Sequence, residues 1–277
     1  MSFISYAQNF EDVMLWRALK HIENGFYIDI GAQDPVIDSV SLAFYEHGWR
    51  GVHVEPTDQY SKKLKEARPD ELIEKVAIGN SSVELEFFEF ADTGLSTADG
   101  AIAIQHELSG YTAVRKEVQV ISMDSLLDKY SYRNVHWLKL DVEGFEKNVI
   151  DSWVESTIRP WVLVIESTLP LTQEQAHTEW EPLILEKGYS FEYFDGLNRF
   201  YVHQDHLELA QAFSMPPNVF DGFELAGTST HCFAQRLLTL AQQAEMKAQQ
   251  AEQELALVYA STSWRITTPL RRFSYFL

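Results

Sequence analysis

Short apolar runs, several of them hydrophobic on both faces, recur along this chain and limit the folds open to it. Strands with two apolar faces are typical of buried parallel sheets. The runs are residues 26–30, 51–54, 72–78, 85–90, 118–121, 137–140 and 161–165. Amphipathic stretches at residues 39–47, 59–67, 123–130 and 146–153 separate several of them. This alternation predicts βαβ units in a doubly wound, Rossmann-like α/β fold.

The last part of the predicted sheet has a different pattern. Residues 189–194 and 199–203 are strand-like and flank the run Asp195-Gly196-Leu197-Asn198, whose residue types favour a tight turn. We therefore expect a mostly parallel sheet that ends in an antiparallel hairpin.

Composition excludes several classes of protein. The 277 residues are 45% hydrophobic, which rules out a disordered chain, and the net charge of −19 disfavours a general nucleic-acid binder. A single cysteine, Cys232, excludes an intrachain disulfide framework. We expect neither a signal peptide nor a membrane span, and hence a cytoplasmic protein.

The composition changes near residue 226, and we predict three parts: a domain at 1–225, a helical or coiled-coil extension at 226–260 and a basic, aromatic tail at 261–277. In the extension, small and apolar residues follow a 4-3 spacing typical of a coiled-coil seam. They are Leu237, Ala241, Ala244, Ala248, Ala251, Leu255 and Val258. The alternative is a single helix packed on its own core.

Two strand ends carry residues suited to a nucleoside ligand. The first strand ends in Asp29-Ile30-Gly31-Ala32, and ligands of open α/β sheets bind at the carboxyl ends of strands. The glycines of the dinucleotide fingerprint are absent after Gly31, which disfavours NAD. The next strand ends in Glu55-Pro56, where a carboxylate can accept hydrogen bonds from both hydroxyls of a ribose. An ordinary strand-to-helix turn and a solvated carboxylate are the alternatives.

Two later strands end in acids. Asp141 and Glu143 follow the strand at 137–140, and Glu166 follows the strand at 161–165. Three carboxylates from neighbouring strand ends can bind a hard divalent cation such as Mg²⁺, or hold a sugar and accept a proton. The alternative is that Asp141 and Glu143 cap the following helix.

Together, the runs SYAQNFEDVML, FYIDIGAQDPVIDSVSLAFYEHGWRGVHVEP, GLST, MDSLL, LKLDVEGFE and FDGLNRFYV resemble the FkbM-type methyltransferases. The resemblance implies a class I methyltransferase fold, S-adenosylmethionine as cofactor, and methyl transfer to a hydroxyl, often on a sugar. Its implied cofactor residues are Asp29, Gly31, Ala32, Glu55, Pro56, Tyr6 and Gln8. It also places Asp141 and Glu143 beside the methyl group, and with Glu166 they are the catalytic candidates.

Residues in the connections are the candidates for acceptor binding. Ser96 and His106 lie in what we expect to be a long loop, and Asn198 lies in the hairpin turn. The expected acceptor is a sugar or glycan hydroxyl of a bacterial polysaccharide or glycoconjugate. A solvated histidine and a purely structural asparagine are the alternatives.

The tail combines Trp264 and Ile266 with three arginines, a pattern suited to an anionic membrane face. We expect it to contact a membrane or a polysaccharide-assembly enzyme, and the extension to form a homo-oligomer. Two other functions stay open: a methyltransferase-like binding module without turnover, and a nicotinamide-dependent oxidoreductase.

Overall fold

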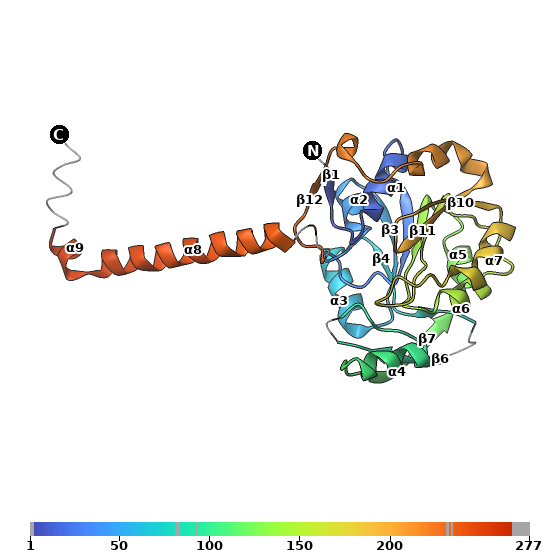
Figure 1. Ribbon diagram of the computed structural model, residues 1–277, viewed down its shortest axis with the longest axis horizontal. Coiled ribbons are helices and arrows are strands. Elements are labelled where there is room, and N and C mark those ends of the chain that lie inside the picture. Colours follow the sequence, from blue (N-terminus) through green and yellow to red (C-terminus); the bar gives the residue numbers. More distant parts are fainter. Residues whose placement is uncertain (1–2, 81–83, 92, 231–232, 234, 268–277) are drawn as a thin grey trace. The chain divides into compact units, whose positions relative to one another are not determined.

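The computed structural model describes residues 3–80, 84–91, 93–230, 233 and 235–267, and its contacts divide the chain into two units, Met1–Ser229 and Thr230–Leu277. The first unit is a mixed α/β domain built on a seven-stranded sheet (Figure 1). In spatial order its strands are β10 (Tyr189–Phe194), β11 (Asn198–His203), β9 (Val162–Glu166), β8 (Trp137–Leu140), β2 (Phe26–Ile30), β3 (Arg50–Val54) and β4 (Leu72–Glu74).

Five neighbouring strands of this sheet, from β9 to β4, are parallel, whereas β11 runs antiparallel to both of its neighbours. The predicted parallel sheet with a terminal antiparallel hairpin is therefore present. Because strands β2, β3, β8 and β9 point the same way, their carboxyl ends meet at one edge of the sheet. This edge is where open α/β sheets bind ligands.

Helices cover both faces of the sheet (Figure 1). The helices of the domain are α1 (Glu11–Leu19), α2 (Leu42–Glu46), α3 (Asp58–Ala67), α4 (Gly100–Leu108), α5 (Met123–Lys129), α6 (Glu146–Asp151) and α7 (Glu181–Glu186), with 3-10 helices η1 (His177–Glu179), η2 (Gln204–Phe213) and η3 (Val219–Asp221). Of these, α4 packs instead against Phe88 and Phe90, next to the smaller sheet of β5, β7 and β6. Side chains of α5, α6 and α7 share one core cluster with Ile28 and Leu138. Those of α1, α2 and η2 share the other with Tyr27 and Trp137, whose rings stack with centroids 4.5 Å apart.

Two smaller sheets complete the domain. In the first, β7 (Val114–Ile121) lies between β5 (Ala77–Ile78) and β6 (Glu84–Glu89). In the second, β1 (Phe3–Ser5) pairs in parallel with β12 (Phe223–Leu225), so the first and last strands of the domain are neighbours. The predicted boundary at residue 225 is the last residue of β12, whereas the first unit extends to Ser229.

Two expectations about local structure are wrong. The run at 72–78 is not one strand: β4 joins the main sheet, while β5 pairs with β7. No glycine or proline lies between β4 and β5. The two strands are separate because β4 pairs with β3 and β5 pairs with β7. His106 lies not in a loop but on α4, which Asp99 caps by accepting hydrogen bonds from the N–H groups of Ala101 and Ile102. The histidine is buried with its ring edge against Phe90.

The second unit contains α8 (Gln235–Ala260) and α9 (Thr262–Ile266). Among the described residues of α8 none is buried, so its seam of small and apolar residues faces solvent in the single chain. The coiled coil therefore remains a prediction. Cys232 and the tail residues after Thr267, including two of its three arginines, lie outside the described residues. In the described part of the chain, no helix combines the length and apolar character needed to cross a membrane.

Candidate active site

A pocket opens at the carboxyl edge of β2, β3 and β8, with about 1150 Å³ of space that extends into open solvent. Six of the seven predicted cofactor residues line it: Gln8, Asp29, Gly31, Ala32, Glu55 and Pro56. The predicted residues Ser96, Asp141 and Glu143 line the same pocket. The sheet edge therefore brings together residues from widely separated parts of the sequence.

Gly31 is required by a close approach of two strand ends. Its φ is +81°, and a Cβ atom there would lie 1.7 Å from the carbonyl oxygen of Asp141. Any side chain at this position would push β2 and β8 apart. The close approach at Gly31 is to the end of the neighbouring strand, and it fixes Asp141 beside the pocket.

Glu55 presents a buried carboxylate at the end of β3. Its Oε1 accepts hydrogen bonds from the Thr57 N–H at 2.8 Å and the Thr57 hydroxyl at 2.5 Å, and its Oε2 accepts one from the Gln33 N–H at 3.1 Å. Burial raises the pKa of Glu55, although the bonds from Thr57 and Gln33 oppose the rise. These bonds hold the carboxylate in one orientation within the pocket wall.

Lys139 lies inside an otherwise apolar strand and interacts with acidic side chains beside the pocket. Lys139 on β8 is the register partner of Asp29 on β2, so both side chains project from the face that α1 covers. The Lys139 Nζ lies 2.5 Å from Asp141 Oδ2. Burial alone would lower the pKa of Lys139, but Asp141 and Asp29 raise it above its usual value. The lysine therefore stays charged and holds Asp141 in place.

The N-terminal segment that leads into α1 supplies one wall of the pocket through Gln8 and through Glu11, the first residue of the helix. Glu11 is buried, and its Oε1 accepts a hydrogen bond from Asn198 Nδ2 at 2.8 Å. Burial and the nearby Asp195 raise the pKa of Glu11 to about 8. Asn9 Nδ2 also donates to the carbonyl oxygen of Asp195 at 3.0 Å. The turn between β10 and β11 thus holds this segment over the sheet edge.

Glu143 lies in a tight loop after β8, with φ of +53°, and Gly144 follows with φ of +90°. The Thr97 hydroxyl donates to the Glu143 carbonyl oxygen at 2.9 Å. Glu146 Oε1 accepts hydrogen bonds from the N–H groups of Val142 and Gly144 at 3.2 and 3.1 Å. These contacts hold the Glu143 backbone in a conformation that residues other than glycine adopt infrequently.

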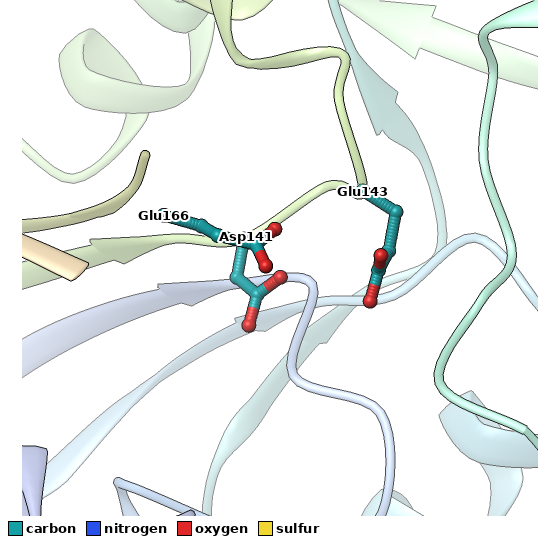
Figure 2. A group of neighbouring side chains, drawn as sticks. All are labelled: Asp141, Glu143 and Glu166. Atoms are coloured by element: carbon teal, nitrogen blue, oxygen red, sulfur yellow. The ribbon is translucent and has the colours of Figure 1, made fainter. Parts of the chain in front are cut away.

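Asp141, Glu143 and Glu166 converge at this edge (Figure 2), and one carboxylate oxygen from each lies within 4.8 Å of the other two. Burial and the negative charge of Asp141 raise the pKa values of Glu143 and Glu166 well above the usual range. Helix α6 begins at Glu146 without a side-chain cap from any described residue. The N-cap residue of α6 is Phe145, so neither Asp141 nor Glu143 occupies that position, and stabilisation of the helix start by their charges remains the alternative.

Four predicted site residues lie outside the pocket lining. Tyr6 instead donates its hydroxyl hydrogen bond to Glu46 at 3.0 Å. His106 packs on α4, Asn198 reaches the pocket wall only through Glu11, and Glu166 lies behind Asp141 and Glu143 in the carboxylate group. The lining also includes Glu11, Gln33 and Lys139, which the sequence analysis missed. The one visible signal for Lys139 was a charged residue inside an otherwise apolar strand.

The largely parallel sheet and the pocket at its carboxyl edge are consistent with a methyltransferase fold. A family model for the methyltransferase FkbM domain matches residues 29–191, more than half of the chain, and this protein belongs to that family. The match includes Glu55 and all three carboxylates of the cluster. A search of curated proteins found no match.

Proposed function

We propose that this protein transfers a methyl group from S-adenosylmethionine to a hydroxyl group, with a sugar or glycan as the acceptor. The observation that carries the proposal is one pocket that joins Glu55 to Asp141 and Glu143. A carboxylate in the position of Glu55 can accept hydrogen bonds from both ribose hydroxyls of the cofactor. The acidic edge then lies where an acceptor would meet the methyl group.

The proposed reaction is an in-line displacement. The acceptor oxygen forms a bond to the methyl carbon, the carbon–sulfur bond breaks, and its electron pair returns to sulfur to give S-adenosylhomocysteine. The hydroxyl proton passes to a carboxylate of the cluster, for which Asp141 lies in the pocket wall. The cofactor supplies the activated methyl group, so the protein contributes mainly position and a proton acceptor.

Sugar acceptors suit the acidic edge because carboxylates accept hydrogen bonds and sugars present several neighbouring hydroxyl donors. Ser96 lies in the same pocket and offers a hydroxyl for the acceptor or cofactor. We retain His106 and Asn198 only as indirect contributors, since their side chains lie behind the lining.

The direct test is incubation with S-adenosylmethionine labelled in its methyl group and a panel of nucleotide sugars and oligosaccharides. Transfer of label to a sugar hydroxyl supports the proposal. Binding of S-adenosylhomocysteine without transfer to any acceptor favours a binding module, and binding of NAD in its place favours an oxidoreductase.

We also propose that α8 joins two copies of this chain. The 4-3 seam is exposed in the single chain, and a parallel pair would place Lys247 of one helix near Glu252 of the other. Alanine-rich seams bury little area, so the pairing would be weak and would depend on protein concentration. Docking of the tail to a membrane or a polysaccharide-assembly enzyme remains a prediction.

A further inference from the structure

The carboxylate cluster of Asp141, Glu143 and Glu166 brings three acidic side chains together at the edge of the sheet. The three side chains come from the end of β8, the following loop and the end of β9, and their carboxyl groups lie near one another (Figure 2). Lys139 is the cation that contacts the cluster, through Asp141 Oδ2 at 2.5 Å. With all three carboxylates ionised, as binding of a divalent cation requires, the cluster and the Lys139 ammonium carry a net charge of −2, which that cation would neutralise.

Glu166 supplies a second, independent observation. Its side chain is only 6% exposed, yet within the described residues its Oε2 atom has no hydrogen-bond partner. Buried polar atoms in native proteins nearly always have a partner, and those without one indicate an absent water or ion. The Glu166 carboxyl group lies beside that of Asp141 in the cluster (Figure 2), so a cation bound by the cluster would give this carboxyl group a further partner.

The donor set also fits a hard cation. All three residues offer carboxylate oxygens, the ligands that Mg²⁺ and Ca²⁺ prefer. The limit of 4.8 Å between the ligating atoms is close to twice the Ca²⁺–oxygen distance of about 2.3–2.6 Å, and a small contraction would suit Mg²⁺. Thr97 and Glu146 hold the backbone of the loop that carries Glu143, so the attachment point of this carboxylate is fixed.

We propose that Asp141, Glu143 and Glu166 bind one hard divalent cation beside the pocket. Its place next to the acidic edge suits a cation that also contacts the acceptor hydroxyl, and this role depends on the proposed function. Binding of the cation itself does not depend on it, because the three ligands belong to this chain alone.

The test uses the full chain, stripped of metal and without cofactor or acceptor. Mn²⁺ titration followed by electron paramagnetic resonance should show one saturable site per chain, and Mg²⁺ or Ca²⁺ should compete for it. Glu166→Gln should weaken Mn²⁺ binding by about ten- to a hundredfold. Glu66→Gln, at a side chain that is 69% exposed, is the matched control and should bind as the unmodified protein does.

Thermal unfolding separates loss of the site from loss of the fold. In chelator, Glu166→Gln should be at least as stable as the unmodified protein, because it removes a buried carboxylate oxygen that has no partner among the described residues. Added Mg²⁺ or Ca²⁺ should raise the melting temperature of the unmodified protein and not that of the variant. The proposal is overturned if no saturable Mn²⁺ site exists, or if Glu166→Gln and the unmodified protein bind Mn²⁺ equally.

Calorimetry with S-adenosylhomocysteine, performed separately, keeps the two proposals apart. Saturable Mn²⁺ binding without cofactor binding would contradict the proposed function and leave the cation site standing. Cofactor binding and methyl transfer without saturable Mn²⁺ binding would contradict the cation site and leave the proposed function standing.

Discussion

Glu55 has both carboxylate oxygens turned to specific donors, from Thr57 and Gln33, at the wall of the pocket. Glu55→Gln keeps the shape of the side chain but removes its charge. We expect the affinity for S-adenosylhomocysteine to fall about tenfold to a hundredfold, because hydrogen bonds to charged groups contribute about 1.5–3 kcal/mol. Isothermal titration calorimetry measures the change. Glu86→Gln, at a side chain that is 57% exposed, should leave the affinity unchanged, and equal affinities in both variants would remove Glu55 from the site.

Asp141 should affect turnover more than cofactor binding. In Asp141→Asn the shape at the end of β8 is kept, and Lys139 retains Asp29 as a charged neighbour. We expect cofactor affinity to change by no more than a few-fold and turnover to fall about a hundredfold or more, as for loss of a proton acceptor. Initial rates on an identified acceptor, with exposed Asp58→Asn as control, measure this. Normal turnover in Asp141→Asn would give this residue a purely structural role.

The raised pKa of Glu11 predicts how the free energy of unfolding depends on pH. In the folded protein its pKa is raised to about 8 by burial and by Asp195, whereas 4.5 is its ordinary value. Between these values the folded state holds a proton that the unfolded chain releases, so this group lowers stability as pH rises from about 5 to 8. The largest slope for one such group is about 1.4 kcal/mol per pH unit.

Glu11→Gln should therefore flatten the decline in stability across this pH range. Urea unfolding at several pH values between 5 and 8 measures the slope. Some slope will remain, because burial also raises the pKa of Asp12 to about 6 and that of Glu146 to about 7. Identical slopes in the variant and the unmodified protein would show that Glu11 is ionised throughout.

Some residues of the candidate site could be predicted from the sequence because an apolar run shows where a buried strand ends. Asp29, Gly31, Glu55 and Asp141 each close or follow an apolar run, and parallel strands bring such positions to one edge. Glu11 could not be found this way, since its partner Asn198 lies 187 positions later. Its role in the pocket wall depends on tertiary packing that no local pattern encodes.

At the scale of elements, helix α8 gives the clearest prediction. If its 4-3 seam joins two copies, Ala251→Glu places a charge in the seam and should reduce self-association strongly. Gln250→Glu adds the same charge on the outer side of the helix and should reduce it little. Sedimentation velocity over a range of concentrations compares the two variants. A monomer at every concentration in the unmodified protein, or equal behaviour of both variants, would contradict the pairing.

Strands of the main sheet were predictable because a strand that is buried on both faces needs a continuous run of apolar residues. Strands β2 and β8 have the expected bounds. The run at 72–78 was mispredicted because two different strand partners divide it after β4. The region around His106 was mispredicted because Asp99 caps a short helix whose apolar side chains are mixed between buried and exposed positions. Local pattern thus identifies strands better than it identifies their partners.

For the whole molecule, the proposed function predicts selective stabilisation by ligands. S-adenosylmethionine and S-adenosylhomocysteine should raise the melting temperature of the core, and NAD should not, because the glycines that bind its pyrophosphate are absent after Gly31. At a hundred times the dissociation constant the stabilisation is about 2.7 kcal/mol. Differential scanning calorimetry of the full chain measures it. Stabilisation by NAD alone would favour an oxidoreductase.

The pairing of β1 with β12, and of Glu11 with Asn198, also sets the order in which a newly made chain can complete its pocket. At about 5–20 residues per second, roughly 10–40 s separate the synthesis of Glu11 from that of Asn198, which lies 187 positions later. During that interval the segment that carries Gln8 and Glu11 has no β11 and no β12 to hold it. Every nascent chain that stops short of these strands therefore lacks the Asn198 and β12 contacts to this part of the chain, and these contacts form only once nearly the whole core has been made.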